Sequence, residues 1–303
     1  MINITFLILH YKNIDETLKC MDSIMSIVSN YNCKWNIVVV DNGSNNGTGE
    51  KLQKQYCEYS NIKVIISKIN EGFSKGNNKG YSYIRNYINS DYVVVTNNDV
   101  IFHQNDFVER IDKIYNEKKF FILGPDIFIR QNKEHQSPIS INAIKIKDIE
   151  NELSMYKFYL DKPRLYVGRR ILQNIKNNIY SNSIIFRKFY NRIFNKINMN
   201  REQQYENVVI QGACIIVSKD YLEVEEKIFS PEPFLYCEEL FLYFKCMKNK
   251  YRIIYDPSIQ IWHEDSASIK YISKNMVDKA KFTLPNHVVA REMLLDYLKD
   301  MSK

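Results

Sequence analysis

Three polar loops each follow an apolar, β-branched run of the sequence. They are residues 41–48, which read Asp-Asn-Gly-Ser-Asn-Asn-Gly-Thr, residues 70–80, and residues 97–99, which read Asn-Asn-Asp. One loop of this kind would mean little, because turns favour the same residue types. Three of them at consecutive strand ends favour a nucleotide-type ligand, since ligands of open α/β sheets bind outside the carboxyl ends of the strands.

The spacing within these loops excludes the common calcium and phosphate motifs. Residues 41–52 resemble a calcium loop, but the third position is Gly43 and the twelfth is Leu52, where a bidentate Glu is required. Residues 72–80 are rich in glycine, yet they fit neither the P-loop pattern nor the GxGxxG dinucleotide pattern. A nucleotide site at these strand ends must therefore be of another kind.

The elements that carry these loops alternate between strands and helices. Strands are predicted at residues 2–9, 36–40, 62–66 and 91–96, and helices at residues 15–28 and 75–88. Near-continuous Val and Ile runs separated by helices indicate a parallel sheet that is covered on both faces. The predicted fold class is α/β, with a Rossmann-like, mostly parallel central sheet flanked by helices.

Strand-like and helix-like segments return after Asn207. The apolar run 208–217, broken by Gly212, suits the sheet. A helix is predicted at residues 237–248, short strands at 251–255 and 258–262, and a C-terminal helical segment at 273–300 that Pro285 interrupts.

Composition describes an ordinary globular protein. The 303 residues are 45% hydrophobic and 25% charged, with a formal net charge of +7. None of the six cysteines forms a CxxC pair and most lie in apolar runs, which is typical of the reduced thiols of a cytoplasmic protein. No apolar run reaches the roughly 18–20 residues of a spanning helix, and the N-terminus lacks the basic start of a signal peptide.

Residues 137–206 interrupt the α/β pattern and are predicted to be a basic, mainly helical insertion. Within it, residues 162–201 carry ten basic side chains and no acidic one. Residues 184–197 have the pattern of an amphipathic helix with aromatics on the apolar face and basic residues on the other. Such a helix suits an anionic membrane surface, although its apolar face could equally pack on the protein's own core. Nucleic acid is not expected as a partner, because no known binding motif accompanies the charge.

An ordered set of motifs resembles family 2 glycosyltransferases with the GT-A fold, in the style of bacterial enzymes that build surface polysaccharides. The resemblance covers about residues 2–130 and 207–268. It rests on Asp41-Asn42-Gly43-Ser44, Asn70-x-Gly72-Phe73 with Gly76-x-Asn78-x-Gly80, Asn97-Asn98-Asp99, Gln211-Gly212-Ala213, Tyr236-Cys237-Glu238-Glu239 and His263. Each motif alone is loose, whereas the order of the set is specific.

The resemblance implies a divalent cation, Mn²⁺ or Mg²⁺, that stabilises the departing nucleoside diphosphate. Family members carry an Asp-x-Asp-like motif where this chain has residues 97–99, so Asp99 would be the only charged ligand there and Asn97 replaces the other. In similar enzymes a His at the position of His263 binds the metal or the diphosphate. A turn or helix-cap role for Asp99 and a structural role for His263 stay open.

The resemblance also implies a nucleotide pocket. Asp41 would contact the base, and Asn70, Gly72 and Asn78 would shape the pocket, together with Asn98 from the loop after the fourth strand. For Asn70 and Asn78, helix capping is nearly as good an explanation. His10 ends the first strand near this predicted pocket and is expected to line it.

An inverting transfer requires a general base for the acceptor hydroxyl, and similar enzymes place it in a Glu-Asp pair at a helix start. Here the pair is Glu238-Glu239. Neighbouring helical residues point about 100° apart, so only one can face the acceptor. Glu239 is the expected base, with Glu238 as the second candidate. Acidic residues in a first turn also favour the helix dipole without any catalytic role.

The sequence pattern predicts four segments, and the resemblance implies one activity. Residues 1–136 would be the nucleotide-sugar-binding half, 137–206 the insertion, 207–268 the acceptor and catalytic half, and 269–303 a C-terminal helical segment. The expected enzyme is an inverting, metal-dependent glycosyltransferase of the hexosyltransferase type. It would use a nucleotide-diphosphate sugar and a glycan or lipid-linked acceptor, in the cytoplasm or at the inner face of the cell membrane.

Two alternatives remain from the sequence. Asn97 in place of an Asp also fits a nucleotide-binding relative that lacks turnover. The second alternative, a sugar-phosphate nucleotidyltransferase, is less favoured. Such enzymes usually have a Gly-rich loop after the first strand, and residues 9–13 contain no glycine.

Overall fold

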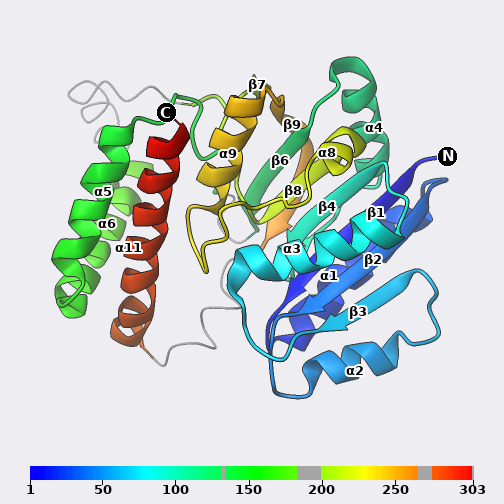
Figure 1. Ribbon diagram of the computed structural model, residues 1–303, viewed down its shortest axis with the longest axis horizontal. Coiled ribbons are helices and arrows are strands. Elements are labelled where there is room, and N and C mark those ends of the chain that lie inside the picture. Colours follow the sequence, from blue (N-terminus) through cyan, green and yellow to red (C-terminus); the bar gives the residue numbers. More distant parts are fainter. Residues whose placement is uncertain (131–133, 183–198, 265–274, 302–303) are drawn as a thin grey trace.

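The computed structural model describes residues 1–130, 134–182, 199–264 and 275–301. Within them, nine strands form one sheet in the order β3-β2-β1-β4-β8-β6-β9-β5, and β7 pairs with β9 (Figure 1). The strands are β1 Asn3–His10, β2 Lys34–Asp41, β3 Ile62–Ile66, β4 Tyr92–Asn97, β5 Val100–Ile101, β6 Ile122–Ile129, β7 Tyr205–Glu206, β8 Cys214–Ser218 and β9 Ile253–His263.

Most strands of the sheet run in one direction. β1, β2, β3 and β4 are parallel neighbours, and β6 and β9 are parallel to each other. β8 is antiparallel to both β4 and β6, so β6 and β9 share the direction of the first four strands. The carboxyl ends of these six strands therefore lie at one edge of the sheet, which we call the carboxyl edge, and β8 begins there. The α/β class with a mostly parallel sheet is confirmed.

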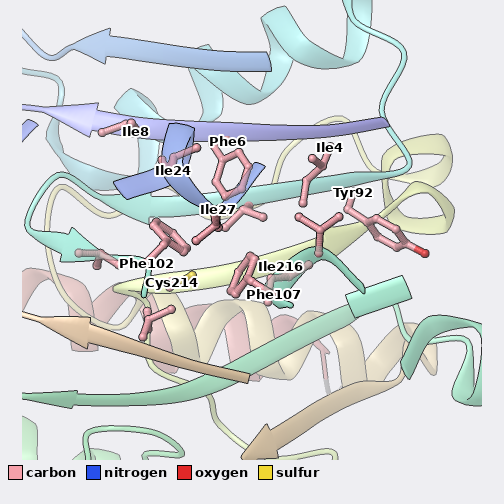
Figure 2. Packing of buried hydrophobic residues seen from close by; sticks show 14 of the residues in the cluster. Ile4, Phe6, Ile8, Ile24, Ile27, Tyr92, Phe102, Phe107, Cys214 and Ile216 are labelled. Atoms are coloured by element: carbon pink, nitrogen blue, oxygen red, sulfur yellow. The ribbon is translucent and has the colours of Figure 1, made fainter. Parts of the chain in front are cut away.

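Helices cover both faces of the sheet. Those packed on the sheet are α1 Ile14–Ser29, α2 Thr48–Gln55, α3 Gly72–Tyr87, α4 Phe107–Lys118, α8 Lys219–Val224 and α9 Glu238–Asn249, and the other helices of the described residues are α5 Ile146–Tyr159, α6 Pro163–Asn182 and α11 Met276–Met301. Successive side chains of a strand point to opposite faces. Phe6 and Val94 accordingly pack with residues of α1, α2 and α4, whereas Leu7 and Val93 pack with residues of α3, α8 and α9. Figure 2 shows the first of these clusters, in which Phe6 lies among residues of α1 and α4.

The predicted insertion and the C-terminal segment supply three helices that stand together beside the sheet (Figure 1). Tyr166 of α6 packs with Ala280 and Leu284 of α11, and Ile149 of α5 packs with Leu294 of α11 in a cluster that includes residues of α9. Arg291 of α11 forms an ion pair with Glu152 of α5 at 2.7 Å. We call α5, α6 and α11 the helical unit.

Two predicted interruptions are absent. α11 continues through Pro285 as one helix over residues 276–301, which indicates that packing against α5 and α6 offsets the lost backbone hydrogen bond. The two short strands expected at residues 251–262 are one strand, β9. Its pairing with β6 shifts register between Pro125 and Asp126, where Asp126 pairs with Gln260. A bulge therefore accommodates Pro257, which has no N–H for the ladder.

No helix in the described part of the chain is both long enough and apolar enough to cross a membrane. The amphipathic segment 184–197, for which membrane contact and packing on the core were both open, lies within residues 183–198 and so outside the described residues.

Candidate functional site

Strand register aligns the predicted site residues at the carboxyl edge. His10 at the end of β1 pairs with Asp41 at the end of β2, and Leu9 pairs with Asn97 at the end of β4. His263 ends β9, opposite Ile129 at the end of β6. Loops that are far apart in the sequence therefore begin next to one another.

Asn42 connects the first two polar loops. Its Nδ2 donates to Asn70 Oδ1 at 3.1 Å and to the Gly72 carbonyl at 2.9 Å, and its Oδ1 accepts from the Glu71 N–H at 3.1 Å. Asp41 is buried, and its Oδ1 accepts from the Ser44 N–H at 3.1 Å. The first loop, residues 41–48, is thus held against residues 70–72, and the carboxylate of Asp41 packs against Gly49 at the start of the next helix.

Gly72 brings this assembly against the back half of the chain. Its φ is +85°, and a Cβ at this position would lie 2.4 Å from the Phe234 carbonyl oxygen. The next residue, Phe73, donates its N–H to that same carbonyl at 2.8 Å. Only glycine combines the left-handed conformation with this close approach.

His10 and Asn98 are buried at the carboxyl edge and contact the start of α1. His10 Nδ1 lies 2.7 Å from Thr17 Oγ1 and its Nε2 lies 2.8 Å from Thr48 Oγ1. Burial lowers the pKa of His10, and the charge of Asp41 partly opposes this shift. Asn98 Nδ2 donates to Thr17 Oγ1 at 3.0 Å and to the Asn13 carbonyl at 3.3 Å. These contacts place both side chains behind the loops, where they fix α1 relative to the sheet.

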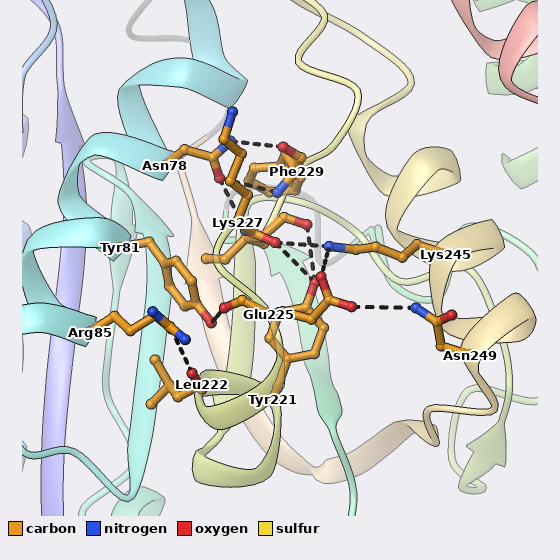
Figure 3. Close-up of polar contacts among 11 residues, drawn as sticks. Asn78, Tyr81, Arg85, Tyr221, Leu222, Glu225, Lys227, Phe229, Lys245 and Asn249 are labelled. Atoms are coloured by element: carbon orange, nitrogen blue, oxygen red, sulfur yellow. Dashed lines mark hydrogen bonds and ion pairs between the residues drawn. The ribbon is translucent and has the colours of Figure 1, made fainter.

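Asn78 links α3 to the segment before α9 (Figure 3). Its Nδ2 donates to the Phe229 carbonyl at 2.7 Å and to Glu232 Oε1 at 2.8 Å. Its Oδ1 accepts from the N–H groups of Ile228 and Phe229 at 3.1 and 3.2 Å. The amide therefore uses both ends to hold residues 228–232.

Asp99 and His263 form a buried pair after β4 and at the end of β9. His263 Nε2 lies 3.2 Å from Asp99 Oδ1, and His263 Nδ1 lies 2.6 Å from Gln136 Oε1. The Glu264 N–H donates to the Asp99 carbonyl at 3.0 Å, which fixes the two backbones side by side.

Glu239 reaches the same edge from α9. Its Oε1 accepts from the Gly212 N–H at 3.2 Å. The next residue, Ala213, accepts a backbone hydrogen bond from Asn97 at 2.9 Å, so Glu239 lies close to the loop that contains Asp99. A Cβ on Gly212 would lie 2.8 Å from that carboxylate oxygen, so a larger residue there would displace the Glu239 side chain.

Glu238 and Glu239 differ in environment although they are neighbours. Glu238 is only 5% exposed, and its Oε1 has no hydrogen-bond partner among the described residues. Burial, followed by the charge of Glu239, raises the pKa of Glu238 well above its ordinary value. Burial also raises the pKa of Glu239, but the Gly212 N–H opposes the shift. We infer that Glu238 holds a proton and that Glu239 carries the charge of the pair.

The family model for glycosyl transferase family 2 matches residues 5–224. The chain belongs to glycosyltransferase family 2. Its sheet is accordingly the mixed, mostly parallel sheet of the GT-A fold. The match spans most of the chain and ends before α9, so the Glu238-Glu239 pair and His263 lie outside it.

Two curated proteins share sequence with this glycosyltransferase over 129 residues at 30% identity. One is the low-salt glycan biosynthesis hexosyltransferase Agl10 of Haloferax volcanii, with 43% of this chain and 38% of that protein covered. The other is the bifunctional glycosyltransferase pgtA of Dictyostelium discoideum, with 42% and 16% covered. The matches thus span well under half of either relative. Among solved structures, S. aureus TarS aligns over 85% of this chain and 61% of its own, with 12% identity and a TM-score of 0.48.

The donor set around Asp99 of this glycosyltransferase fits a metal ion only with help from substrate. Among the described residues, no group of three or more His, Cys, Asp or Glu side chains could hold a metal ion. Asp99 and His263 offer one carboxylate and one imidazole. Mg²⁺ and Mn²⁺ sites of nucleotide enzymes often use one or two carboxylates and take the remaining oxygens from phosphate and water. The pair is compatible with such a shared site.

Sequence reasoning did not identify two contributors to this site. Asn42 appeared only as part of a motif, and Gln136 follows no recognisable pattern, although it contacts His263. The polar character of the loop that contains Asn42 was a usable signal. For Gln136 there was none, because its contact depends on how the chain returns after β6.

The turn before Glu238 is a further feature that the sequence did not reveal. Tyr236 and Cys237 both have positive φ, +74° and +64°, which is uncommon for residues with side chains. The ring of Tyr236 stacks on His287 of α11 with a centroid distance of 3.6 Å, and Tyr156 of α5 stacks on the opposite side at 4.3 Å. The helical unit therefore holds the turn that presents the two glutamates.

Proposed function

We propose that this protein transfers a sugar from a nucleotide-diphosphate sugar to a glycan or lipid-linked acceptor, with inversion at the anomeric carbon. The reaction would serve synthesis of a bacterial surface polysaccharide such as capsule or O-antigen. The observation that carries the proposal is that Asp41, the Asp99–His263 pair and Glu239 all lie at the carboxyl edge of the sheet. A family 2 chain with this arrangement would have groups for the nucleotide base, the diphosphate and the acceptor hydroxyl at one edge of the sheet.

Glu239 is the proposed general base. It would accept the proton of the acceptor hydroxyl while that oxygen attacks the anomeric carbon and the bond to the diphosphate breaks. Desolvation raises the pKa of Glu239, and a raised pKa makes the carboxylate a stronger base for the acceptor hydroxyl. Glu238, which we infer to be protonated, would add no second negative charge beside the acceptor.

Asp41 is the proposed contact of the nucleotide base, as a carboxylate that accepts from a ring N–H. Asn70 and Gly72 would shape the pocket through the contacts with Asn42 described above. His10, Asn78 and Asn98 are proposed to support the pocket from behind. Their contacts within the protein favour this role over direct binding.

Asp99 and His263 would hold a Mn²⁺ or Mg²⁺ ion that enters with the donor. When bound, the ion supplies Lewis-acid stabilisation of the charge on the departing diphosphate. Gln136 would orient the imidazole through His263 Nδ1, so that Nε2 faces Asp99. We propose that the reaction takes place in the cytoplasm, at the inner face of the cell membrane.

Titration with nucleoside diphosphates tests the proposal. UDP, GDP and dTDP are titrated into the protein in a calorimeter, with and without Mn²⁺. Turnover of the matching nucleotide sugars is then followed as release of the nucleoside diphosphate. We expect one nucleotide to bind, Asp41→Asn to weaken it, and Asp22→Asn on the exposed side of α1 to leave it unchanged. Absence of binding for all three would refute the proposal. Binding without turnover of any sugar would favour the inactive relative that Asn97 also fits.

A further inference from the structure

The face of α6 that points away from the protein is apolar. Leu165, Leu172 and Ile175 are 55%, 69% and 52% exposed. The opposite face packs inward, because Tyr166 is buried against Ala280 and Leu284 of α11. Residues 165, 172 and 175 are separated by seven and three positions, so they form one stripe along the helix. We call these three side chains the outer stripe.

An exposed apolar stripe on a helix that already buries its other face requires an explanation. A helix at the surface of a soluble protein normally turns charged residues to water and apolar ones to the core. On α6 the two sides both carry apolar side chains, and those of the outer side are spread over almost three turns. Phe158, which is 55% exposed near the end of α5, adds an aromatic ring to the same unit.

The polar residues beside the outer stripe carry positive charge. α6 contains Arg164, Arg169, Arg170 and Lys176 and no acidic residue. Helical geometry places Arg164 on one side of the stripe and Arg169 on the other. Lys162 Nζ lies 3.9 Å from the centroid of the Phe158 ring at the connection between the two helices.

Acidic residues of the neighbouring helix leave positive charge in excess. Glu150 of α5 lies within 3.5 Å of Lys147, and Glu152 is paired with Arg291 of α11. Over α5, α6 and their connection, seven basic residues stand against four acidic ones. The outer face of α6 thus combines an apolar centre with basic flanks.

We propose that the outer face of α6 docks on an anionic lipid bilayer, with the outer stripe in the acyl boundary and the arginines among the headgroups. Leucine and isoleucine at the centre with arginine at the margins is the arrangement of helices that lie in a membrane interface. A nucleic acid would instead need the cations at the centre of the contact. The inference goes beyond the proposed transferase activity and does not depend on it.

Docking through α6 would also orient the candidate site. α11 contacts α6 on one side and Phe241 of α9 on the other, and α9 begins at Glu238. The helical unit therefore connects the bilayer directly to the helix that presents the two glutamates. The candidate site would then lie close to the membrane surface, where a lipid-linked acceptor is found.

Co-sedimentation with vesicles tests the proposal without donor or acceptor, so its result is separable from that of the activity assay. The full chain is mixed at low salt with vesicles of phosphatidylcholine alone or of phosphatidylcholine with phosphatidylglycerol. We expect binding only to the second kind. Each basic residue near an anionic surface contributes about fivefold, so Arg164→Gln with Arg169→Gln should weaken binding about 25-fold. Leu172→Ser with Ile175→Ser should weaken it at least about tenfold.

Matched controls remove the same charge or apolar area elsewhere. Lys51→Gln with Lys54→Gln on α2 and Tyr87→Ser at the end of α3 alter exposed residues far from the helical unit, and they should bind as the unchanged protein does. Thermal melts confirm that every variant is folded.

Several outcomes would overturn the proposal. They are no binding to anionic vesicles, equal binding to both kinds of vesicle, or binding that the α6 variants leave intact. Tighter binding to duplex DNA than to vesicles would make the face a nucleic-acid surface. A dimer in solution that Leu172→Ser with Ile175→Ser dissociates would make it an interface between copies.

Discussion

Replacing each glutamate of the α9 pair by glutamine should separate their roles. Glutamine keeps the shape of the side chain and removes its ability to accept a proton. Because Glu239 accepts from the Gly212 N–H and Glu238 Oε1 has no partner among the described residues, we infer that Glu239 carries the charge of the pair. Glu239→Gln should therefore lower kcat by about 10²–10⁴-fold, the usual contribution of a positioned base. Glu238→Gln should leave kcat nearly unchanged.

The pH profile gives a second, independent measure of the same inference. Burial raises the pKa of Glu239, so activity should fall on the acid side at a pH above the ordinary value for glutamate, 4.5. In Glu238→Gln this acid limb should not move, because the replaced side chain was already neutral. Release of nucleoside diphosphate from the nucleotide sugar, followed across pH, measures both effects. Nucleotide affinity by calorimetry is the control, and it should be the same in both variants.

Stability should respond in the opposite sense to activity. Glu238 keeps its proton when folded and loses it when unfolded, so the folded state binds more protons above pH 4.5 and stability falls as pH rises through this window. The loss is about 1.4 kcal/mol for each pH unit until the raised folded-state pKa is reached. Glu238→Gln should reduce the loss to the part that the raised pKa of Glu239 causes, and it should melt at a higher temperature at neutral pH. Equal loss of kcat in both variants, or a less stable Glu238→Gln, would refute the assignment.

Three further predictions follow from individual contacts. Burial lowers the pKa of His287 to about 3, so the unfolded chain takes up a proton below the ordinary pKa of 6.5 while the folded protein does not. The protein should therefore lose about 2 kcal/mol of stability between neutral pH and pH 5. Thermal melts across pH should show this loss in the unchanged protein and not in His287→Phe. Asp99→Asn and His263→Ala should each weaken the Mn²⁺-dependent part of nucleoside-diphosphate affinity about tenfold while metal-free affinity stays constant in calorimetry. Gly72→Ala should cost about 1–3 kcal/mol more in denaturant unfolding than Gly47→Ala, because both have positive φ but only Gly72 meets a carbonyl.

The first half of the fold could be predicted from the sequence because its strands are buried on both faces. β3 was predicted at residues 62–66 with its observed bounds, and β1, β2 and β4 were placed within two residues of theirs. Such strands appear as unbroken β-branched runs that turn residues delimit. β6 was not predicted, because Gly124, Pro125 and Asp126 interrupt its apolar run. α2 was missed because its eight residues, mostly polar, bury little besides Leu52.

The residues gathered at the carboxyl edge were predicted from strand ends, whereas their individual contacts were not. Sheet geometry alone places the loops after β1, β2 and β4 together, so Asp41 and Asp99 could be grouped from the sequence. The four hydrogen bonds of Asn78 depend on residues 228–232, about 150 positions later in the chain. No local pattern specifies such a contact. The functional roles of these residues stay predictions.

The position of Glu239 depends on the one antiparallel strand within the central part of the sheet. β8 runs against β4, so it begins where β4 ends, and residues 211–213 meet residues 97–99. Had β8 been parallel to β4, Gly212 would lie at the opposite edge and Glu239 would be a strand length away from Asp99. The reversal brings a carboxylate from α9 to the loops of the first half without a long connection. The reversed direction of β8 between β4 and β6 is therefore what allows the two halves of the chain to contribute to one site.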